Sequence, residues 1–271
     1  MSVAASAPAE ARNLLATGVR FSICTLVTRA EQYQEMLASF RAKGFDADDC
    51  EFIQIDNRRG NTYDAFQGCN LFLTVARGEY VILCHQDIAL IDGRPELEHV
   101  IEGLDRLDDR WAACGNSGGM SPGRLAIRLT DPHGADQRTA DFPARVYSLD
   151  ENFILVRRSA NLSLSSDLSG FHLYGTDLCI VADFLGRSTY VVDFHLRHFS
   201  PGKRDHTLTT ARRNLVAKYV RAFRSRWVMA PCELVFLSGL PGLSRGLSSS
   251  WLARLRRRTV GRKRSCVRSG G

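Results

Sequence analysis

The first ninety residues of the chain switch between strand-like and helix-like patterns of apolar and polar positions. Strands are predicted at 20–27 (RFSICTLV) and 51–56 (EFIQID), and a third covers the mainly apolar stretch 78–90. Between them, apolar residues recur at helical spacing after residue 30 and again within 61–76. This strand–helix alternation predicts an α/β fold, a mainly parallel sheet flanked by helices.

The pattern is looser in the rest of the chain. A helix is expected at 96–107, a strand running into a glycine-rich loop at 111–119, loops at 120–145, two strand pieces at 146–158, a loop and helix at 170–186, a strand at 188–203 and a basic helix at 205–228. The predicted organisation is a flexible N-terminus (1–18), one α/β domain (19–202) and a basic helical extension with a frayed tail (203–271).

Polar side chains stand where the three predicted parallel strands end. They are 25–28, Asp56 with Asn57, and the tripeptide His85-Gln86-Asp87, which interrupts an apolar run. Ligands of open parallel sheets bind outside the carboxyl ends of the strands. Asp87 is therefore expected at the rim of a pocket and not inside the core.

Neither common phosphate-binding loop is present. The turn after the first strand reads TLVTRAEQ, without the glycines of a dinucleotide-binding fingerprint, and no Walker loop occurs. A divalent cation held by Asp87, with His198 as a second ligand, could neutralise a diphosphate instead. The competing interpretation is structural, because a single Asp or His at a strand end more often caps or packs.

The distribution of charge indicates the kind of partner to expect, and the cysteines indicate the cellular compartment. The chain has 271 residues, and 203–271 contain 17 Lys and Arg against 2 Asp and Glu. A solvated extension, a surface for anionic membrane lipid and, less favoured, nucleic-acid binding are all compatible with this. Eight cysteines without a C-x-x-C pair indicate reduced thiols and not a zinc site. A cytoplasmic protein, or a peripheral one at the inner face of the membrane, is expected.

Two blocks of the sequence resemble the GT-A glycosyltransferases, in particular the inverting family 2 type. The first is DNRRGNTYDAFQGCNLFLTVARGEYVILCHQDIAL and the second is GFHLYGTDLCIVADFLGRSTYVVDFHLRHFSPGK. The resemblance runs from about residue 20 to residue 202. It implies a GT-A, Rossmann-like fold and transfer of a sugar, as in the hexosyltransferases, from a nucleotide-diphosphate donor to an acceptor hydroxyl with inversion.

The same resemblance implies roles for individual residues. Asp177 would be the catalytic base, and Asp87 with His198 would bind Mn²⁺ or Mg²⁺. Donor binding would fall to Thr25, Val27, Asp56, Asn70, His85 and Gln86, and the acceptor side to His172, Tyr174 and Trp111. The acceptor would be a glycan, lipid-linked or protein hydroxyl. His85 stands where the family's metal motif, Asp-x-Asp, has its first acidic residue.

The same residues have other interpretations. Asp150 and Glu151 compete with Asp177 for the role of base, and Asp177 could simply stabilise a helix N-terminus. Asp56 could close an ordinary Asx turn. The chain could also be a non-catalytic module that binds nucleotide sugars, or a basic nucleic-acid-binding protein.

Overall fold

The computed structural model describes residues 18–202, 206–229 and 234–248. The chain divides into two compact units, Met1–Arg212 and Arg213–Gly271. The predicted flexible N-terminus, apart from Gly18, and the predicted frayed basic tail fall outside the described residues.

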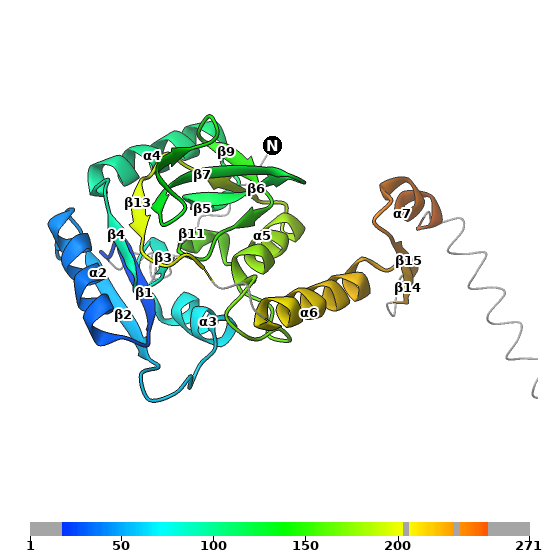
Figure 1. Ribbon diagram of the computed structural model, residues 1–271. Coiled ribbons are helices and arrows are strands. Elements are labelled where there is room, and N and C mark those ends of the chain that lie inside the picture. Colours follow the sequence, from blue (N-terminus) through cyan, green and yellow to red (C-terminus); the bar gives the residue numbers. More distant parts are fainter. Residues whose placement is uncertain (1–17, 203–205, 230–233, 249–271) are drawn as a thin grey trace, which may run out of the picture. The chain divides into compact units, whose positions relative to one another are not determined.

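The first unit is built on a seven-stranded mixed sheet (Figure 1). Its strand order is β2-β1-β3-β11-β5-β12-β9. Strands β2, β1 and β3 are parallel, as predicted, and β11 runs antiparallel between β3 and β5. The strands are β1 (Phe21–Val27), β2 (Cys50–Asp56), β3 (Tyr80–Cys84), β5 (Trp111–Gly115), β9 (Ala144–Val146), β11 (Phe153–Arg157) and β12 (Ser188–Val191).

A second sheet changes the predicted structure of three stretches of the chain. It has the order β10-β6-β7-β13-β4, with β8 paired to β7. The region 120–145, expected to be loops, contains β7, β8 and β9, and the stretches at 78–90 and 188–203 each split between the two sheets. These short strands depend on partners distant in the sequence. They are β4 (Ile88–Leu90), β6 (Ser117–Ser121), β7 (Arg124–Asp131), β8 (Gly134–Arg138), β10 (Ser148–Leu149) and β13 (Leu196–His198).

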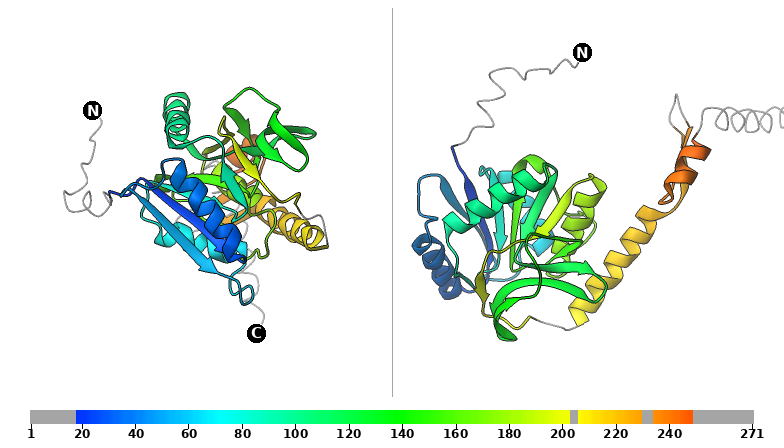
Figure 2. Two further views of the ribbon diagram at one scale, coloured as in Figure 1. Left: turned by 60° about the vertical axis from the view of Figure 1, so that its left-hand side comes forward. Right: turned by 90° about the horizontal axis from the view of Figure 1, so that it is seen from above.

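Helices cover both faces of the large sheet (Figure 2). Apolar residues of α2 (Ala30–Ala42) and α4 (Arg94–Leu107) share one buried cluster with β1, β3 and the second sheet's β4 and β13. On the opposite face α3 (Ala65–Val75) packs on β1 and β3, and α5 (Tyr174–Phe184) packs on β12 and β10. A short 3₁₀ turn, η1 (Arg158–Ala160), follows β11. Strand β1 is therefore buried on both faces, as is typical of parallel strands.

Within the described residues 206–229 and 234–248, the C-terminal region is less helical than predicted. Helix α6 (His206–Phe223) ends five residues before the expected limit of 228, because β14 (Arg226–Met229) pairs with β15 (Leu234–Leu237) as a hairpin. The rings of Trp227 and Phe236 lie 5.0 Å apart across this pair. Helix α7 (Pro241–Leu247) follows. Among the helices that the structure describes, none combines the length and the apolar character that a bilayer crossing requires.

Candidate functional site

A pocket of about 310 Å³ lies at the carboxyl ends of β1 and β3, on the side covered by α3. Its wall combines an apolar floor with a polar rim. The lining residues are Cys24, Leu26, Thr28, Ala65, Cys69, Phe72, Leu83, Cys84, His85, Gln86, Asp87, Phe171 and Tyr174. The predicted position of Asp87 at the rim of a pocket agrees with this lining.

The residues of β1 that line the pocket are not the predicted ones. Thr25 and Val27 are 1% and 2% exposed and are not among the lining residues, so their contact with the nucleotide-sugar donor stays a prediction. Successive side chains of a strand point to opposite faces. The face toward α3 therefore carries Cys24, Leu26 and Thr28, while Val27 belongs to the cluster beneath α2.

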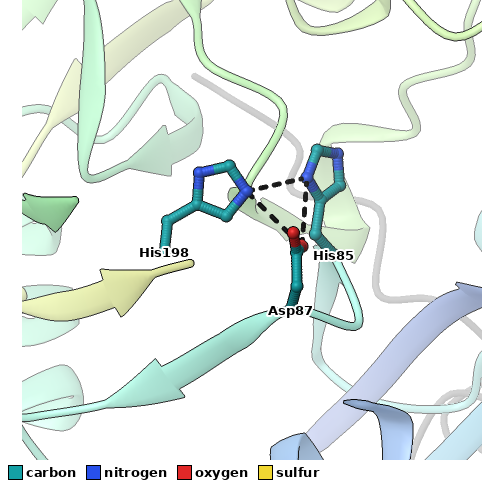
Figure 3. A group of neighbouring side chains, drawn as sticks. All are labelled: His85, Asp87 and His198. Carbon is teal, nitrogen blue, oxygen red and sulfur yellow. Dashed lines mark hydrogen bonds and ion pairs between the residues drawn. The ribbon is translucent and has the colours of Figure 1, made fainter. Parts of the chain in front are cut away.

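Three side chains meet at the rim and have the composition of a metal site (Figure 3). The Nε2 atom of His198 lies 3.4 Å from Oδ1 of Asp87 and 3.4 Å from Nδ1 of His85. The distance from His85 Nδ1 to Asp87 Oδ1 is 3.9 Å. Three ligands of one ion at tetrahedral positions and about 2.1 Å would be separated by about 3.4 Å. The donor set therefore fits a divalent transition-metal ion.

The backbone explains why these residues converge. Strand β3 ends at Cys84 and β4 begins at Ile88, so residues 85–87 form the connection between the two sheets. Strand β13 pairs with β4, and this pairing places His198 opposite Ile88. The amide of Phe199 also donates to the carbonyl of Asp87, at 3.0 Å. Main-chain hydrogen bonds therefore fix both Asp87 and His198.

The electrostatics favour the protonation states that a metal ligand needs. Burial, together with the neighbouring His198, lowers the pKa of His85. Burial alone would raise the pKa of Asp87, but the hydrogen bond and charge of His198 hold that pKa below its ordinary value. A neutral imidazole and an ionised carboxylate are the ligand forms of these side chains.

Gln86 joins the rim of the pocket to the start of α2. Its Oε1 accepts hydrogen bonds from the backbone amides of Thr28 and Arg29, at 2.8 and 2.9 Å. Its Nε2 donates to the hydroxyl of Thr28, at 2.7 Å. Gln86 lies in the pocket wall, as predicted, and its contacts fix the loop after β1.

Three other predicted site residues form structural contacts away from the pocket lining. Asn70 binds the main chain of Leu164 through both amide atoms, at 3.0 and 2.8 Å. Trp111 is fully buried and stacks on Tyr80, with ring centroids 6.0 Å apart. These contacts give both side chains structural roles, and the donor contact of Asn70 and the acceptor contact of Trp111 stay predictions. His172, predicted on the acceptor side, binds the Thr207 hydroxyl at 3.0 Å instead.

Asp56 lies at the end of β2, is half exposed, and forms an ion pair with Arg58. Arg58 donates to it from its backbone amide and from Nε and Nη2, at 3.0, 2.8 and 2.6 Å. These hydrogen bonds hold the pKa of Asp56 far below its ordinary value. Asp56 is not among the lining residues of the pocket. An Asx turn accounts for these contacts, and a contact between Asp56 and the nucleotide-sugar donor stays a prediction.

The assignment of Asp177 as the base does not fit the structure. Asp177 is 0% exposed, and its two carboxylate oxygens accept hydrogen bonds from the amide and the hydroxyl of Ser165, both at 2.7 Å. A general base must come within hydrogen-bond reach of the proton that it removes. Its hydrogen bonds with Ser165 instead connect the segment before α5 with the first turn of that helix.

The two competing carboxylates, Asp150 and Glu151, have different surroundings. Asp150 accepts hydrogen bonds from the amide of Asn152, at 3.0 Å, and closes a turn. Burial and the charge of Asp150 raise the pKa of Glu151 to about 8. The hydroxyl of Tyr174, a pocket-lining residue, donates to the Glu151 carbonyl at 3.1 Å.

Several pocket residues were not predicted from the sequence. Cys69 and Phe72 are two of the apolar residues at helical spacing within 61–76, and they form the apolar wall. Phe171 adds an aromatic ring that is 40% exposed. No sequence signal separates these residues from ordinary core positions, because α3 uses one face both to pack on the sheet and to line the pocket.

The chain resembles a protein from Fuscovulum blasticum described as "ATP synthase subunits region ORF 6". The two are 39% identical over 228 residues, which is 81% of this chain and 91% of that protein. No protein-family model matches the chain.

Solved structures of other proteins resemble the fold, among them two glycosyltransferases. GalNAc-T7 with UDP, GalNAc and Mn²⁺ has a TM-score of 0.51 at 9% identity, over 73% of this chain and 48% of that one. The mannosyltransferase PcManGT from Pyrobaculum calidifontis, in complex with GDP-Man and Mn²⁺, has a TM-score of 0.50 at 15% identity, over 86% of this chain and 69% of that one. At these identities the likeness shows the fold alone: it is the GT-A fold, as the sequence resemblance implied.

Proposed function

The chain belongs to the same family as the ORF 6 protein of Fuscovulum blasticum, and we propose that it is a glycosyltransferase. It would move a sugar from a nucleotide-diphosphate donor to an acceptor hydroxyl. One observation carries this proposal: in a GT-A fold, His85, Asp87 and His198 come together at the rim of a pocket at the strand ends.

The pocket has two regions with different chemistry. Leu26, Cys69 and Phe72 form an apolar wall that suits the flat faces of a nucleoside, while Asp87 marks the polar rim. A diphosphate placed at that rim would be next to the three candidate metal ligands. GalNAc-T7 and PcManGT were both solved with a nucleotide or nucleotide sugar and Mn²⁺, which supports this arrangement for the present chain.

Sugar transfer requires that the protein stabilise the leaving group and remove the proton of the attacking hydroxyl. When bound, a divalent cation stabilises the negative charge that grows on the departing nucleoside diphosphate. His85, Asp87 and His198 would hold that cation, and a carboxylate would remove the proton of the attacking hydroxyl. Single displacement by that hydroxyl breaks the bond between the anomeric carbon and the diphosphate oxygen and inverts the anomeric centre.

We assign the role of base to Glu151. Its pKa of about 8 suits a group that must take up a proton near neutral pH. The main-chain carbonyl of Glu151 accepts a hydrogen bond from Tyr174, which lines the pocket and reaches His85 at 3.2 Å.

A non-catalytic nucleotide-sugar-binding module is the second candidate. The observation that favours it is the burial of Asp177, the carboxylate at the position where the family resemblance implies a base. Such a module would keep the pocket and the metal site without turning over its ligand.

The test combines turnover and binding. A panel of UDP- and GDP-sugars is incubated with Mn²⁺, and release of the nucleoside diphosphate is measured for the wild type, Asp87→Ala and Glu151→Gln. A transferase releases diphosphate, and both substitutions abolish the release while circular dichroism shows an intact fold. Calorimetric binding of UDP or GDP without release of diphosphate from any donor would instead establish the binding module.

Helix α6 supports a further proposal, contact with anionic membrane lipid. Val216, Val220 and Phe223 recur at helical spacing and are 57%, 65% and 56% exposed. The segment from 203 onward carries a large excess of Lys and Arg. An exposed apolar stripe beside basic residues is typical of interfacial helices. We expect the protein to co-sediment with phosphatidylglycerol vesicles and not with phosphatidylcholine vesicles, and to lose this binding when all three residues are replaced by Ser.

A further inference from the structure

A second cavity, of about 300 Å³, lies at the ends of β7 and β13 in the second sheet. These two strands are parallel neighbours, so their carboxyl ends meet at the same edge of that sheet, where ligands of open sheets bind. The cavity is lined by Thr130, Asp131, Pro132, Arg197, His198 and Phe199. None of the residues that the sequence resemblance implies for the acceptor side lines it.

The second cavity adjoins the candidate metal site through His198 (Figure 3). His85 and Asp87 line the first pocket, whereas His198 lines the second cavity. Because Nε2 of His198 lies 3.4 Å from Oδ1 of Asp87, the two cavities meet at this group of side chains. A molecule bound in the second cavity is therefore near the rim proposed for the diphosphate.

Hydrogen bonds hold both sides of the second cavity in place. On the β7 side, Oδ1 of Asp131 accepts from the amide of His133, at 2.8 Å, in the turn into β8. On the β13 side, the amide of Phe199 donates to the carbonyl of Asp87, at 3.0 Å. Nε2 of His133 donates to the carbonyl of Pro201, at 3.0 Å, and joins the two sides. The wall is thus formed before a ligand binds.

Three side chains of the wall are available to a ligand. The ring of Phe199 is 52% exposed. Within the part of the chain that the structure describes, the guanidinium of Arg197 forms no hydrogen bond or ion pair, and Oδ2 of Asp131 accepts no hydrogen bond. The cavity therefore offers an aromatic face, a cationic donor and an anionic acceptor.

This combination suits a sugar ring better than a simple anion. A pyranose presents C–H groups on its faces, which contact the electron-rich face of an aromatic ring, and hydroxyls at its edge, which both donate and accept. Arg197 can only donate and an ionised Asp131 can only accept, so the pair matches hydroxyls. A phosphate would meet the negative charge of Asp131 together with the positive charge of Arg197, and the two contributions oppose each other.

We propose that the second cavity binds a sugar residue of a glycan, with the ring on Phe199 and its hydroxyls on Arg197 and Asp131. Sugar binding itself does not require catalysis. A second consequence rests on the proposed function: the cavity would hold the acceptor beside the donor, and the acceptor would be a glycan and not a protein hydroxyl or a lipid alcohol.

The test measures sugar binding to the full-length protein without metal or nucleotide. Methyl glycosides of glucose, galactose, mannose, N-acetylglucosamine and N-acetylgalactosamine are titrated separately, and saturation-transfer NMR reports binding and affinity. We expect at least one of them to bind with a dissociation constant in the millimolar range, because a single ring makes few contacts.

Variants of the wall make the test specific. Phe199→Ala removes the aromatic face and Arg197→Ala the donor, and each should weaken the binding of that glycoside by about fivefold or more. Phe199→Tyr keeps the ring and should bind like the wild type. The matched controls are Phe184→Ala on α5, whose ring is also 52% exposed, and Arg124→Ala at the opposite end of β7, and both should bind normally. Thermal unfolding shows that each variant is folded.

The inference is overturned if none of the glycosides binds, or if Phe199→Ala and Arg197→Ala leave the affinity unchanged. Inorganic phosphate provides a further arm of the test. If phosphate binds, loses affinity in Arg197→Ala and the glycosides do not bind, the cavity is an anion site and the inference fails.

Failure of the proposed function has a different signature. If a glycoside binds through Phe199 and Arg197 but no nucleotide sugar is consumed, the sugar site stands and the transferase proposal fails. If nucleoside diphosphate is released, no glycoside binds and none accelerates the release, the transferase proposal stands and the sugar site fails.

Discussion

Ser165 donates two hydrogen bonds of 2.7 Å to Asp177, one from its amide and one from its hydroxyl, and so occupies both oxygens of that carboxylate. The relationship connects the segment before α5 to the first turn of the helix. These two hydrogen bonds support a structural role for Asp177.

Asp177→Asn should reduce stability and spare turnover. An Asn side chain replaces one accepting oxygen with an NH₂ group, which then faces a donor of Ser165 inside the protein. We expect a loss of about 1–3 kcal/mol in the free energy of unfolding, measured by urea denaturation. Ser165→Ala, which keeps the amide, should cost less. A folded Asp177→Asn protein that has lost all turnover would restore Asp177 as the base.

Glu151 should make the stability of the protein depend on pH. Its folded-state pKa is about 8, above the ordinary value of 4.5, because it is buried and lies next to Asp150. Between these two values the folded state binds more protons than the unfolded state, so the free energy of unfolding falls as pH rises from about 4.5 to 8. Glu151→Gln should flatten this fall in urea titrations at several pH values.

The exposed position Glu35 on α2 provides the control for this measurement. Glu35→Gln should follow the wild-type curve throughout the same pH range. Identical pH dependence in the wild type and Glu151→Gln would show that Glu151 ionises normally, and the proposed base would lose its main electrostatic support.

Gly78 should resist substitution. A Cβ atom at this position would lie 2.6 Å from the backbone nitrogen of Ser22 and 2.8 Å from the carbonyl oxygen of Tyr80. Gly78→Ala should therefore force β1 and β3 to shift, at a cost of about 1–3 kcal/mol in thermal or urea unfolding. Gly103→Ala, on α4 where a Cβ meets nothing within 4 Å, should instead stabilise by up to about 1 kcal/mol.

Gln86 should affect ligand binding through the loop that it holds. Gln86→Ala removes the acceptor for the amides of Thr28 and Arg29. With each hydrogen bond contributing about 0.5–1.5 kcal/mol, UDP or GDP binding should weaken by about tenfold in calorimetry. Gln86→Glu keeps the accepting oxygens and should bind almost like the wild type. Equal affinities for all three proteins would mean that the loop needs no such support.

Much of the architecture followed from local patterns in the sequence. Helix α4 and the strands β1 and β2 match their predicted ranges closely, and α2 begins where helical spacing was predicted, because each element carries its own periodicity and its own turn signals. The interruption of an apolar run at 85–87 predicted correctly that Asp87 lies at a pocket rim, and the resemblance paired it with His198. These conclusions needed only neighbouring residues or a known motif.

Tertiary structure alone decided which side chains face the pocket. Strand β1 is buried on both faces, so its sequence has no polar–apolar alternation to distinguish Thr25 and Val27 from Cys24 and Leu26. The roles of Asp177 and His85 likewise depend on Ser165 and Tyr174, which belong to other segments. The sequence thus determined the elements and the chemistry at the strand ends, because those are local properties. Packing between distant segments determined which groups are enclosed and which can reach a ligand.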